Sequence, residues 1–329
     1  MNTVAFDLLA FMLGVYVLLD GYDLGVATIA PLVARTSNER ADSMHAIGPY
    51  WNGNEVWLIA AGGAIFAFFP KAYASIFSGF YLPFIVVLWL LMFRGMAMEL
   101  RGHFPSAIWR DFWDFCFSAS SALLIVLFGV TLGNLVRGVP LDAAGYFIGT
   151  FSLLLNPFAV LVGVLAIVVL SMHGALFVML RVSGPPAARA RKVIAYAAPV
   201  AFVLYTLVTA EAFSILGWHI VASTWAILPI IGLASLAGET FVALRGHART
   251  AFGFSCAFLL SLLLGAAAAM YPYVLPGYPQ RAAGLSIFTS SPSPVALSSA
   301  LAVSIVGLCI VVAYSAFVMW SLPKVPPSH

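Results

Sequence analysis

The chain has 329 residues, of which 63% are hydrophobic and 8% are charged, and its formal net charge is +3. Soluble domains carry about 25% charged residues, so this composition excludes a soluble globular protein. It predicts an all-α polytopic membrane protein, with residues 1–329 forming a single integral membrane domain. The small net charge gives no support for nucleic-acid binding, since membrane proteins distribute their basic residues asymmetrically by rule.

Apolar segments long enough to cross a bilayer recur along the whole chain. A spanning helix needs about 20 mostly apolar residues, and nine segments qualify. They cover residues 5–30, 50–69, 73–98, 113–136, 157–181, 193–216, 220–243, 250–271 and 294–321. The stretch from Asp142 to Leu180 is too long for one span, so we assign Gly145 to Asn156 to an outer loop.

The distribution of Lys and Arg orients these spans. With the N-terminus outside, twelve of the fifteen basic residues fall on the inner side, and only Lys71, Arg137 and Arg281 fall outside. Because basic residues concentrate on the cytoplasmic side, this pattern predicts an outer N-terminus and a cytoplasmic C-terminus. A topology with eight spans would break the asymmetry from the missed helix onward, so the count also favours nine.

A short internal similarity suggests a duplication. Leu100-Arg101-Gly102-His103 ends the third span, Leu244-Arg245-Gly246-His247 ends the seventh, and each is followed by an Arg and then a Cys. Residues 1–140 and 141–275 are therefore candidate repeats, with 294–321 as a peripheral last helix. Four spans return the chain to the same side, so the repeat would be parallel. Chance explains four matching residues about as well.

Three acidic residues lie inside the first two spans. Asp20 and Asp23 are three residues apart, so a helix places them on one face, and Glu55 lies in the second span. Carboxylates at this depth are unfavourable unless they face a cavity, a partner or a proton path. Two alternatives follow. The acids are structural and bond to the backbone or to Arg94, or they form a protonatable relay, which we favour.

Relative depth favours a cluster of these carboxyls. At about 1.5 Å of rise per residue, Asp20, Asp23 and Glu55 lie roughly 16, 12 and 10 Å from the inner ends of their spans. Consecutive spans usually pack as neighbours, so we expect a ladder that ascends from the cytoplasm. Crowded carboxylates cannot all ionise in a low dielectric, so at least one should carry a proton. Glu211 and Glu239 lie near span ends, where solvated positions are the default.

Polar residues flank the acids. Asn52 and Asn54 can hold water between the carboxyls, and Trp51 and Trp57 are supporting polar residues or anchors at the membrane interface. Arg94, in the third span, pairs with one of the acids or extends to the interface.

Small residues mark one edge of the first span. Gly21 and Gly25 have the spacing that lets a second helix approach closely, and Gly14 extends this edge outward. We therefore expect helix packing along these glycines.

Histidine and cysteine patterns predict no metal or haem site within this chain alone. Only His173 lies well inside a span, and no pair of histidines has the spacing of a metal motif. We expect His173 to be a hydrogen-bonded core residue. Cys116, Cys256 and Cys309 are isolated among apolar residues and are expected to be free thiols. No catalytic residue is predicted in this chain.

Several motifs are specific enough to indicate a family. In the first half they are Asp20-Gly21-Tyr22-Asp23-Leu24-Gly25, Gly48-Pro49-Tyr50-Trp51-Asn52-Gly53-Asn54-Glu55-Val56-Trp57-Leu58, Ala60-Ala61-Gly62-Gly63-Ala64, Phe77-Ser78-Gly79-Phe80-Tyr81, and Gly129 to Pro140. In the second half the similarity rests on hydropathy and on His173-Gly174-Ala175. With these motifs the chain resembles subunit II of cytochrome bd-type quinol oxidases.

The resemblance implies a multi-pass subunit of a respiratory terminal oxidase in the bacterial inner membrane. Electrons from quinol would reduce O2 to water, with net charge separation but without proton pumping. Haem b and haem d would be held mainly by an obligate subunit I. A structural quinone and a small third subunit are compatible with the family. The implied fold has two four-helix bundles and one peripheral helix, which agrees with nine spans.

The resemblance also implies a role for this chain. It would support subunit I and line a route for cytoplasmic protons, with Asp20, Asp23, Asn52 and Glu55 as candidates, and it would be inactive alone. Some members have Asp at the position of Asn52. Asn52 cannot carry a proton, so Glu55, Asp20 or water would bear more of that role here.

Two other classes of function remain open. A proton-coupled secondary transporter suits mid-membrane acids and a repeat, and it predicts activity of the isolated chain without haem. A purely structural scaffold predicts that Asp20→Asn and Glu55→Gln leave turnover intact.

Overall fold

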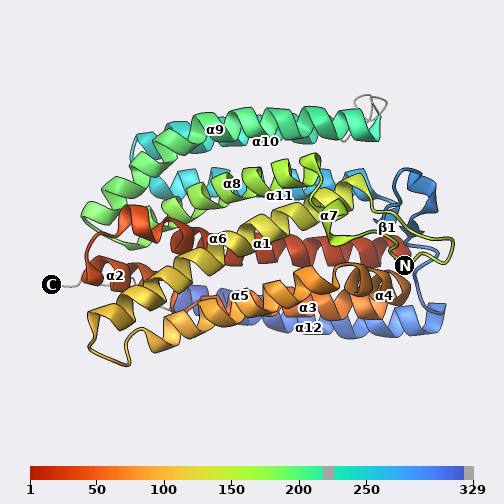
Figure 1. Cartoon of the computed structure of the whole chain (residues 1–329), viewed down its shortest axis with the longest axis horizontal. Coiled ribbons are helices and arrows are strands. Elements are labelled where there is room, and N and C mark those ends of the chain that lie inside the picture. Colours follow the sequence, from red (N-terminus) through yellow and green to blue (C-terminus); the bar gives the residue numbers. More distant parts are fainter. Residues whose placement is uncertain (218–225, 322–329) are drawn as a thin grey trace.

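The computed structural model describes residues 1–217 and 226–321. Its long helices lie side by side along one axis, with α1 in the middle and the N-terminus at one end (Figure 1). The helices are α1 (Asn2–Val33), α2 (Ser37–Ile47), α3 (Trp51–Phe68), α4 (Pro70–Gly79), α5 (Tyr81–Leu100), α6 (Ala107–Arg137), α7 (Phe151–Leu154), α8 (Pro157–Arg181), α9 (Pro185–Leu216), α10 (Ile227–Leu244), α11 (Ala248–Met270) and α12 (Pro294–Ser321). Two short antiparallel strands, β1 (Tyr273–Leu275) and β2 (Leu285–Ser286), pair near the N-terminal end.

Within the described residues, eight helices are long and apolar enough to cross a membrane: α1, α5, α6, α8, α9, α10, α11 and the part of α12 from Pro294 to Phe317. The predicted span 50–69 corresponds to α3, which has 18 residues and is a helix as expected. It falls outside the eight because its first turns carry Asn52, Asn54 and Glu55. The first residues of the predicted span 220–243 lie outside the described residues.

The predicted span 73–98 is divided in the structure. Helix α4 ends at Gly79 and α5 begins at Tyr81, with Phe80 between them outside regular helical geometry. Pro83 explains the break, because its ring nitrogen cannot donate the hydrogen bond that a continuous helix would send to the Gly79 carbonyl. The membrane-crossing segment is therefore α5, and α4 is a separate short helix.

Helix α1 lies in the middle of the array and contacts several other helices (Figure 1). It contacts α3, α6, α8, α9 and α11, and α6 also packs extensively on α8. Helix α5 packs on α6, and α8, α9, α10 and α11 pack on one another. Helix α12 lies against α3 at the edge of the array (Figure 1). The two groups of helices therefore meet at α1 and along the contact between α6 and α8.

The contact between α1 and α8 is a backbone-to-backbone crossing. A Cβ atom added at Gly25 would lie 2.0 Å from the carbonyl oxygen of Leu170, and one added at Gly174 would lie 2.2 Å from the carbonyl carbon of Gly25. At Gly21 the nearest atom to such a Cβ is a Leu170 methyl carbon at 3.0 Å. Gly14 differs, because nothing lies within 4 Å of its Cβ position. The crossing therefore depends on Gly25 and Gly174.

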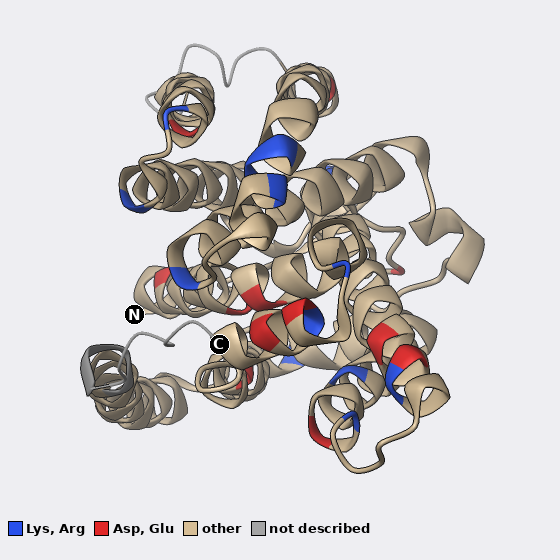
Figure 2. Cartoon of the chain, turned by 90° about the vertical axis from the view of Figure 1, so that its left-hand side faces the viewer, with Lys and Arg blue, Asp and Glu red and all other residues tan. Residues whose placement is uncertain are grey.

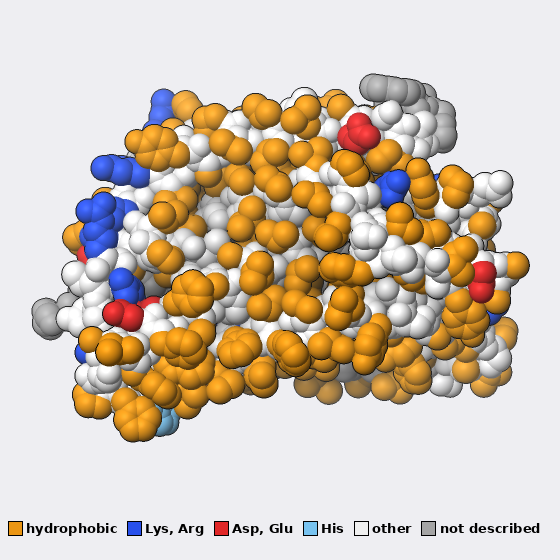
Figure 3. All heavy atoms as spheres, viewed as in Figure 1, with side chains coloured by type: hydrophobic (Ala, Val, Ile, Leu, Met, Phe, Trp, Pro, Cys, Tyr) orange, Lys and Arg blue, Asp and Glu red, His pale blue; other side chains and the backbone are white. Residues whose placement is uncertain are grey.

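Helix α2 closes one end of the array. Thr36 and Glu39 form a capping box at its start, and Glu39 also pairs with Arg189 of α9, with Oε1 and Nη2 2.8 Å apart. The hydrogen bonds from Arg189 are the main reason that the pKa of Glu39 is lowered to about 2. The pair therefore stays charged at neutral pH. In Figure 3, Lys and Arg side chains gather at this end, and hydrophobic side chains cover the middle.

The α1–α8 crossing leads to a first prediction. Gly25→Ala should destabilise the protein by about 1–3 kcal/mol or more, because a methyl group cannot fit against the α8 backbone without moving one helix. Gly14→Ala on the same helix is the matched control and should be neutral. Thermal unfolding of the purified protein in detergent measures both. Equal unfolding midpoints for the two variants would contradict the prediction.

Candidate functional site

One arginine and three carboxyls form a buried cluster between α1, α3 and α5. Arg94 of α5 and both Asp20 and Asp23 of α1 have side chains with 0% exposure. Nη2 of Arg94 lies 2.8 Å from Oδ1 of Asp20 and 3.8 Å from Oδ2 of Asp23. Its Nη1 lies 2.7 Å from Oε1 of Glu55 on α3. Viewed along the helices, acidic and basic segments meet inside the array (Figure 2).

The structure thus brings together the three acids that spacing and depth predict to converge. They surround one guanidinium and do not form an open ladder. Arg94 pairs with the acids and does not extend to the interface, so the first of its two alternatives holds. Glu55 is the outermost member, with 23% of its side chain exposed.

The charges of this cluster do not balance. Three ionised carboxylates and one guanidinium would leave a net charge of −2 in a site where Asp20, Asp23 and Arg94 are fully buried. Like charges this close cannot all persist in a low dielectric, which supports the expectation that at least one of the three carboxyls carries a proton. Among the described residues, Oδ2 of Asp20 and Oδ1 of Asp23 have no hydrogen-bond partner. These oxygens are available to a proton or to water.

Asn54 and Trp51 fix the geometry around the acids. The Asn54 amide donates to Oδ2 of Asp23 at 2.7 Å and to the hydroxyl of Tyr22 at 2.9 Å. The Trp51 ring faces the Arg94 guanidinium, with 5.9 Å between the guanidinium carbon and the ring centroid. Both residues come from the first turn of α3, which explains why this apolar helix begins with polar side chains. Trp57 is buried but belongs to another contact, edge to face with Phe11.

Asn52 is not part of the cluster. It is exposed, on the same side of α3 as Val56 and Ile59, and makes no hydrogen bond to the three carboxyls. This position gives no support to the expectation that Asn52 holds water between them. Hydropathy cannot show the rotation of α3 about its own axis, which decides that Asn54 faces inward and Asn52 outward.

His173 confirms the expectation of a hydrogen-bonded core residue. Its Nδ1 lies 2.9 Å from the Ser255 hydroxyl, and its Nε2 lies 3.1 Å from the carbonyl oxygen of Leu18. Both ring nitrogens are therefore engaged, and neither is available to a haem iron. No group of three or more His, Cys, Asp or Glu in the described residues could hold a metal ion.

Glu239 corrects a second expectation. It is 1% exposed and not solvated, although it lies only five residues before the end of α10. Its burial follows from the packing of α10 on α11, which the sequence pattern does not show. Glu211 of α9 is exposed, as expected.

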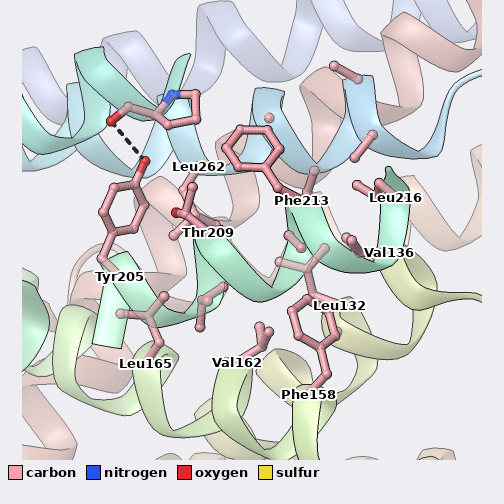
Figure 4. A pocket seen from close by; sticks show the side chains of 18 of the residues that line it. Leu132, Val136, Phe158, Val162, Leu165, Tyr205, Thr209, Phe213, Leu216 and Leu262 are labelled. Atoms are coloured by element: carbon pink, nitrogen blue, oxygen red, sulfur yellow. Dashed lines mark hydrogen bonds between the residues drawn. The ribbon is translucent and has the colours of Figure 1, made fainter. Parts of the chain in front are cut away.

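A separate cavity of about 510 Å³ lies between α6, α8, α9, α10 and α11. Its walls are mostly apolar, and the hydroxyls of Tyr205 and Thr209 are among its few polar groups (Figure 4). Tyr205 donates to the carbonyl oxygen of Pro229 at 3.4 Å. This volume suits a small apolar molecule, and no part of the Arg94 cluster lines it. Sequence patterns gave no sign of it.

Comparisons with known proteins indicate the family of this chain. The family model described as cytochrome bd terminal oxidase subunit II matches residues 1–322. The chain is 31% identical to cytochrome bd-I ubiquinol oxidase subunit 2 of Escherichia coli K12, over 92% of this chain and 89% of that protein. It is 30% identical to a probable cytochrome oxidase subunit 2 of Haemophilus influenzae, over 93% and 89%. A chain of the bd oxidase structure from Geobacillus thermodenitrificans has the same fold, with a TM-score of 0.77, 17% identity and 97% coverage of both chains.

The buried cluster generates a second prediction. Arg94→Leu should destabilise the protein by about 3–5 kcal/mol, because it leaves three carboxyls without their cation. Arg35→Leu removes the same charge from an exposed position and is the matched control. Asp20→Asn added to Arg94→Leu should restore part of the loss. The unfolding midpoint of the purified protein measures each change, and equal midpoints for Arg94→Leu and Arg35→Leu would contradict the prediction.

Proposed function

The chain belongs to the cytochrome bd terminal oxidase subunit II family, and we propose that its Arg94 cluster carries protons from the cytoplasm toward the site of oxygen reduction. The family resemblance drawn from the motifs is thereby confirmed. The protein is a subunit of a respiratory quinol oxidase, a multi-pass protein of the bacterial inner membrane, and its family implies a partner subunit I.

The observation that carries this proposal is the excess of carboxyls around a single buried guanidinium. A group that passes protons needs both a protonated and an ionised form within reach. Three carboxyls on one Arg94 provide this, because a proton can move from one to another while the cation stays in place. Glu55 is partly exposed on α3 and Asp20 and Asp23 are buried, which supports entry at Glu55 and storage deeper in the bundle.

The topology in the membrane is part of the proposal. We infer that α3 also crosses the membrane, which gives nine spans together with the eight helices described above. It packs beside α1 and α12, and its first, polar turns face Arg94. The basic end that holds α2 would face the cytoplasm, with the N-terminus outside. The packing of α1, α3, α5 and α6 and of α8 to α11 supports two four-helix bundles, with α12 peripheral. It is also compatible with repeats 1–140 and 141–275.

The partner and the cofactors follow from the same reasoning. The exposed apolar side of α3 and α5, with Val56, Ile59, Leu88 and Trp89, is the face that we assign to subunit I. Haem b and haem d would then be held mainly by subunit I, since His173, the histidine deep inside a span of this chain, has both ring nitrogens engaged. The cavity of Figure 4 is the candidate location for a structural quinone. The family is compatible with a small third subunit.

The proposed route separates charge across the membrane, and it does so without pumping protons. Protons consumed at the oxygen site would come from the cytoplasm, and quinol would release its own protons outside. This chain alone would be inactive, because it contributes the route and not the redox centres. The transporter alternative is not favoured by the family match, which extends over residues 1–322.

Oxygen consumption by the purified complex tests the proposal. Asp20→Asn and Glu55→Gln should lower turnover at least about tenfold while the haem spectrum is retained, because loss of a positioned proton carrier typically reduces rates 10²–10⁴-fold. Asp7→Asn, an exposed acid on the same helix as Asp20, is the matched control and should leave turnover unchanged. Haem loss in the variants would assign the acids to the support of subunit I. Full turnover with haem retained would favour the scaffold alternative.

A further inference from the structure

A second cavity, of about 360 Å³, lies at the end of the array that holds α2, between α1, α2 and α6. The proposed topology places this end in the cytoplasm. A water molecule occupies about 30 Å³, so the cavity has room for several. No residue lines both this cavity and the one in Figure 4. The residues that matter for its chemistry are Ala30 of α1, Arg40 of α2, and Asp111, Asp114 and Ser118 of α6.

Charged side chains surround the mouth of this cavity. Nη1 of Arg40 lies 3.1 Å from Oδ1 of Asp111 and 3.1 Å from Oδ2 of Asp114. Nε of Arg101 lies 2.5 Å from Oδ1 of Asp114. These two bases and two acids balance in charge, and 71% of the Asp111 side chain is exposed. The mouth is therefore polar, neutral as a whole and open to solvent.

The wall of the cavity carries a buried hydroxyl without a bond. Ser118 lines the cavity and is 9% exposed, and its Oγ has no hydrogen-bond partner among the described residues. Ser121, one turn further along α6, is 0% exposed, and its Oγ also has no partner in that part of the chain. Buried polar groups nearly always bond to protein or to ordered water. The two hydroxyls therefore indicate water sites that continue from the cavity into the bundle.

Ser120 on the same helix shows the usual alternative. Its hydroxyl donates to the carbonyl oxygen of Cys116, one turn back, at 2.6 Å. Serines inside helices commonly bond to their own backbone in this way. In the described structure Ser118 and Ser121 do not make this bond. Their hydroxyls thus remain available to water, whereas that of Ser120 does not.

The two available hydroxyls lie on the side of α6 that faces α1. Ser118 and Ser121 are three residues apart and so share one face of α6, and Ser118 lines the cavity together with Ala30 of α1. Asp23 is seven residues before Ala30, which is about two turns along the same face of α1. The line from Ser118 to Ser121 and the line from Ala30 to Asp23 therefore run inward along the same interface.

A contact further along these helices gives the depth of Ser121. Helices α1 and α6 run in opposite directions (Figure 1), and Tyr16 of α1 packs edge to face with Phe128 of α6, with 5.8 Å between the ring centroids. Asp23 is seven residues from Tyr16, and Ser121 is seven residues from Phe128, which is roughly 10 Å in each case. Ser121 therefore lies at about the depth of Asp23. The Oδ1 atom of Asp23 is likewise buried and unbonded within the described residues.

We propose that this cavity is a water-filled inlet that delivers cytoplasmic protons past Ser118 and Ser121 to Asp23. The inference rests on the proposed proton route and adds a second approach to the Arg94 cluster, from α6, beside the entry at Glu55 on α3. A hydroxyl both accepts and donates, so each serine takes a proton from water on one side as it gives its own hydrogen to the other. The serines are unchanged after each transfer, and no other reactant is needed.

Oxygen consumption by the purified complex tests the inlet in the Glu55→Gln background, where the entry on α3 is already removed. Adding Ser118→Leu fills the cavity with an apolar side chain and should lower the remaining turnover at least about tenfold with the haem spectrum retained, because positioned proton-transfer groups supply that much or more. Ser118→Thr keeps a hydroxyl and should restore most of this loss. Ser120→Ala is the matched control, since its hydroxyl is bonded to the backbone, and should leave turnover unchanged.

Two results would overturn the inlet. The first is unchanged turnover when Ser118→Leu or Ser121→Ala is added, and Ser121→Ala alone decides if Ser118→Leu does not assemble. The second is an equal loss in Ser118→Leu and Ser118→Thr, which would assign the loss to packing. Asp20→Asn separates this outcome from failure of the proposed route. Lost turnover in Asp20→Asn with intact serine variants contradicts the inlet alone, and full turnover in Asp20→Asn contradicts the route itself.

Discussion

A guanidinium without any exposed surface is the constraint on which the first half of the structure depends. Arg94 can be buried only if carboxylates surround it, and they come from α1 and α3 while Arg94 itself comes from α5. This requirement sets how the three helices are rotated toward one another. The burial of Arg94 also means that the structural and the proton-relay interpretations of Asp20 and Asp23 do not exclude each other. They are structural, because they hold Arg94, and they are protonatable, because three carboxyls exceed the charge of one arginine.

The close crossing of α1 and α8 connects this cluster to the rest of the chain. Gly25 and Gly174 bring the two backbones into contact, so the residues beside them on α1 lie against α8. Tyr22, which accepts from Asn54 on one side, stacks on Phe177 of α8 at a centroid distance of 4.1 Å on the other. A displacement of α8 would therefore act on Asn54, and through it on Asp23. The glycines thus contribute to the geometry of a site that they do not touch.

Sequence reasoning succeeded where a pattern runs along a helix and failed where rotation or packing decides. Hydropathy predicted the eight described helices that are long and apolar enough to cross a membrane, although it joined α4 to α5. Spacing with depth predicted that Asp20, Asp23 and Glu55 converge. The outward position of Asn52 depends on the rotation of α3, which a mixed apolar and polar sequence does not fix. Glu239 was expected to be solvated because depth along α10 does not show that α11 covers it. The cavity of Figure 4 results from the packing of five helices and has no local signal.

The two buried acid sites solve the same physical problem in different ways. The Arg94 cluster keeps ionised groups by supplying a cation, so the uptake of one proton changes its net charge. Glu239 has no Lys or Arg within ion-pair distance among the described residues, so burial favours its neutral, protonated form, which cannot take up a second proton. An electron that enters a redox centre in a partner subunit attracts positive charge, and only a site that gains net charge can respond by taking up a proton. This is the electrostatic reason for placing the proposed proton route at Asp20, Asp23 and Glu55 and not at Glu239.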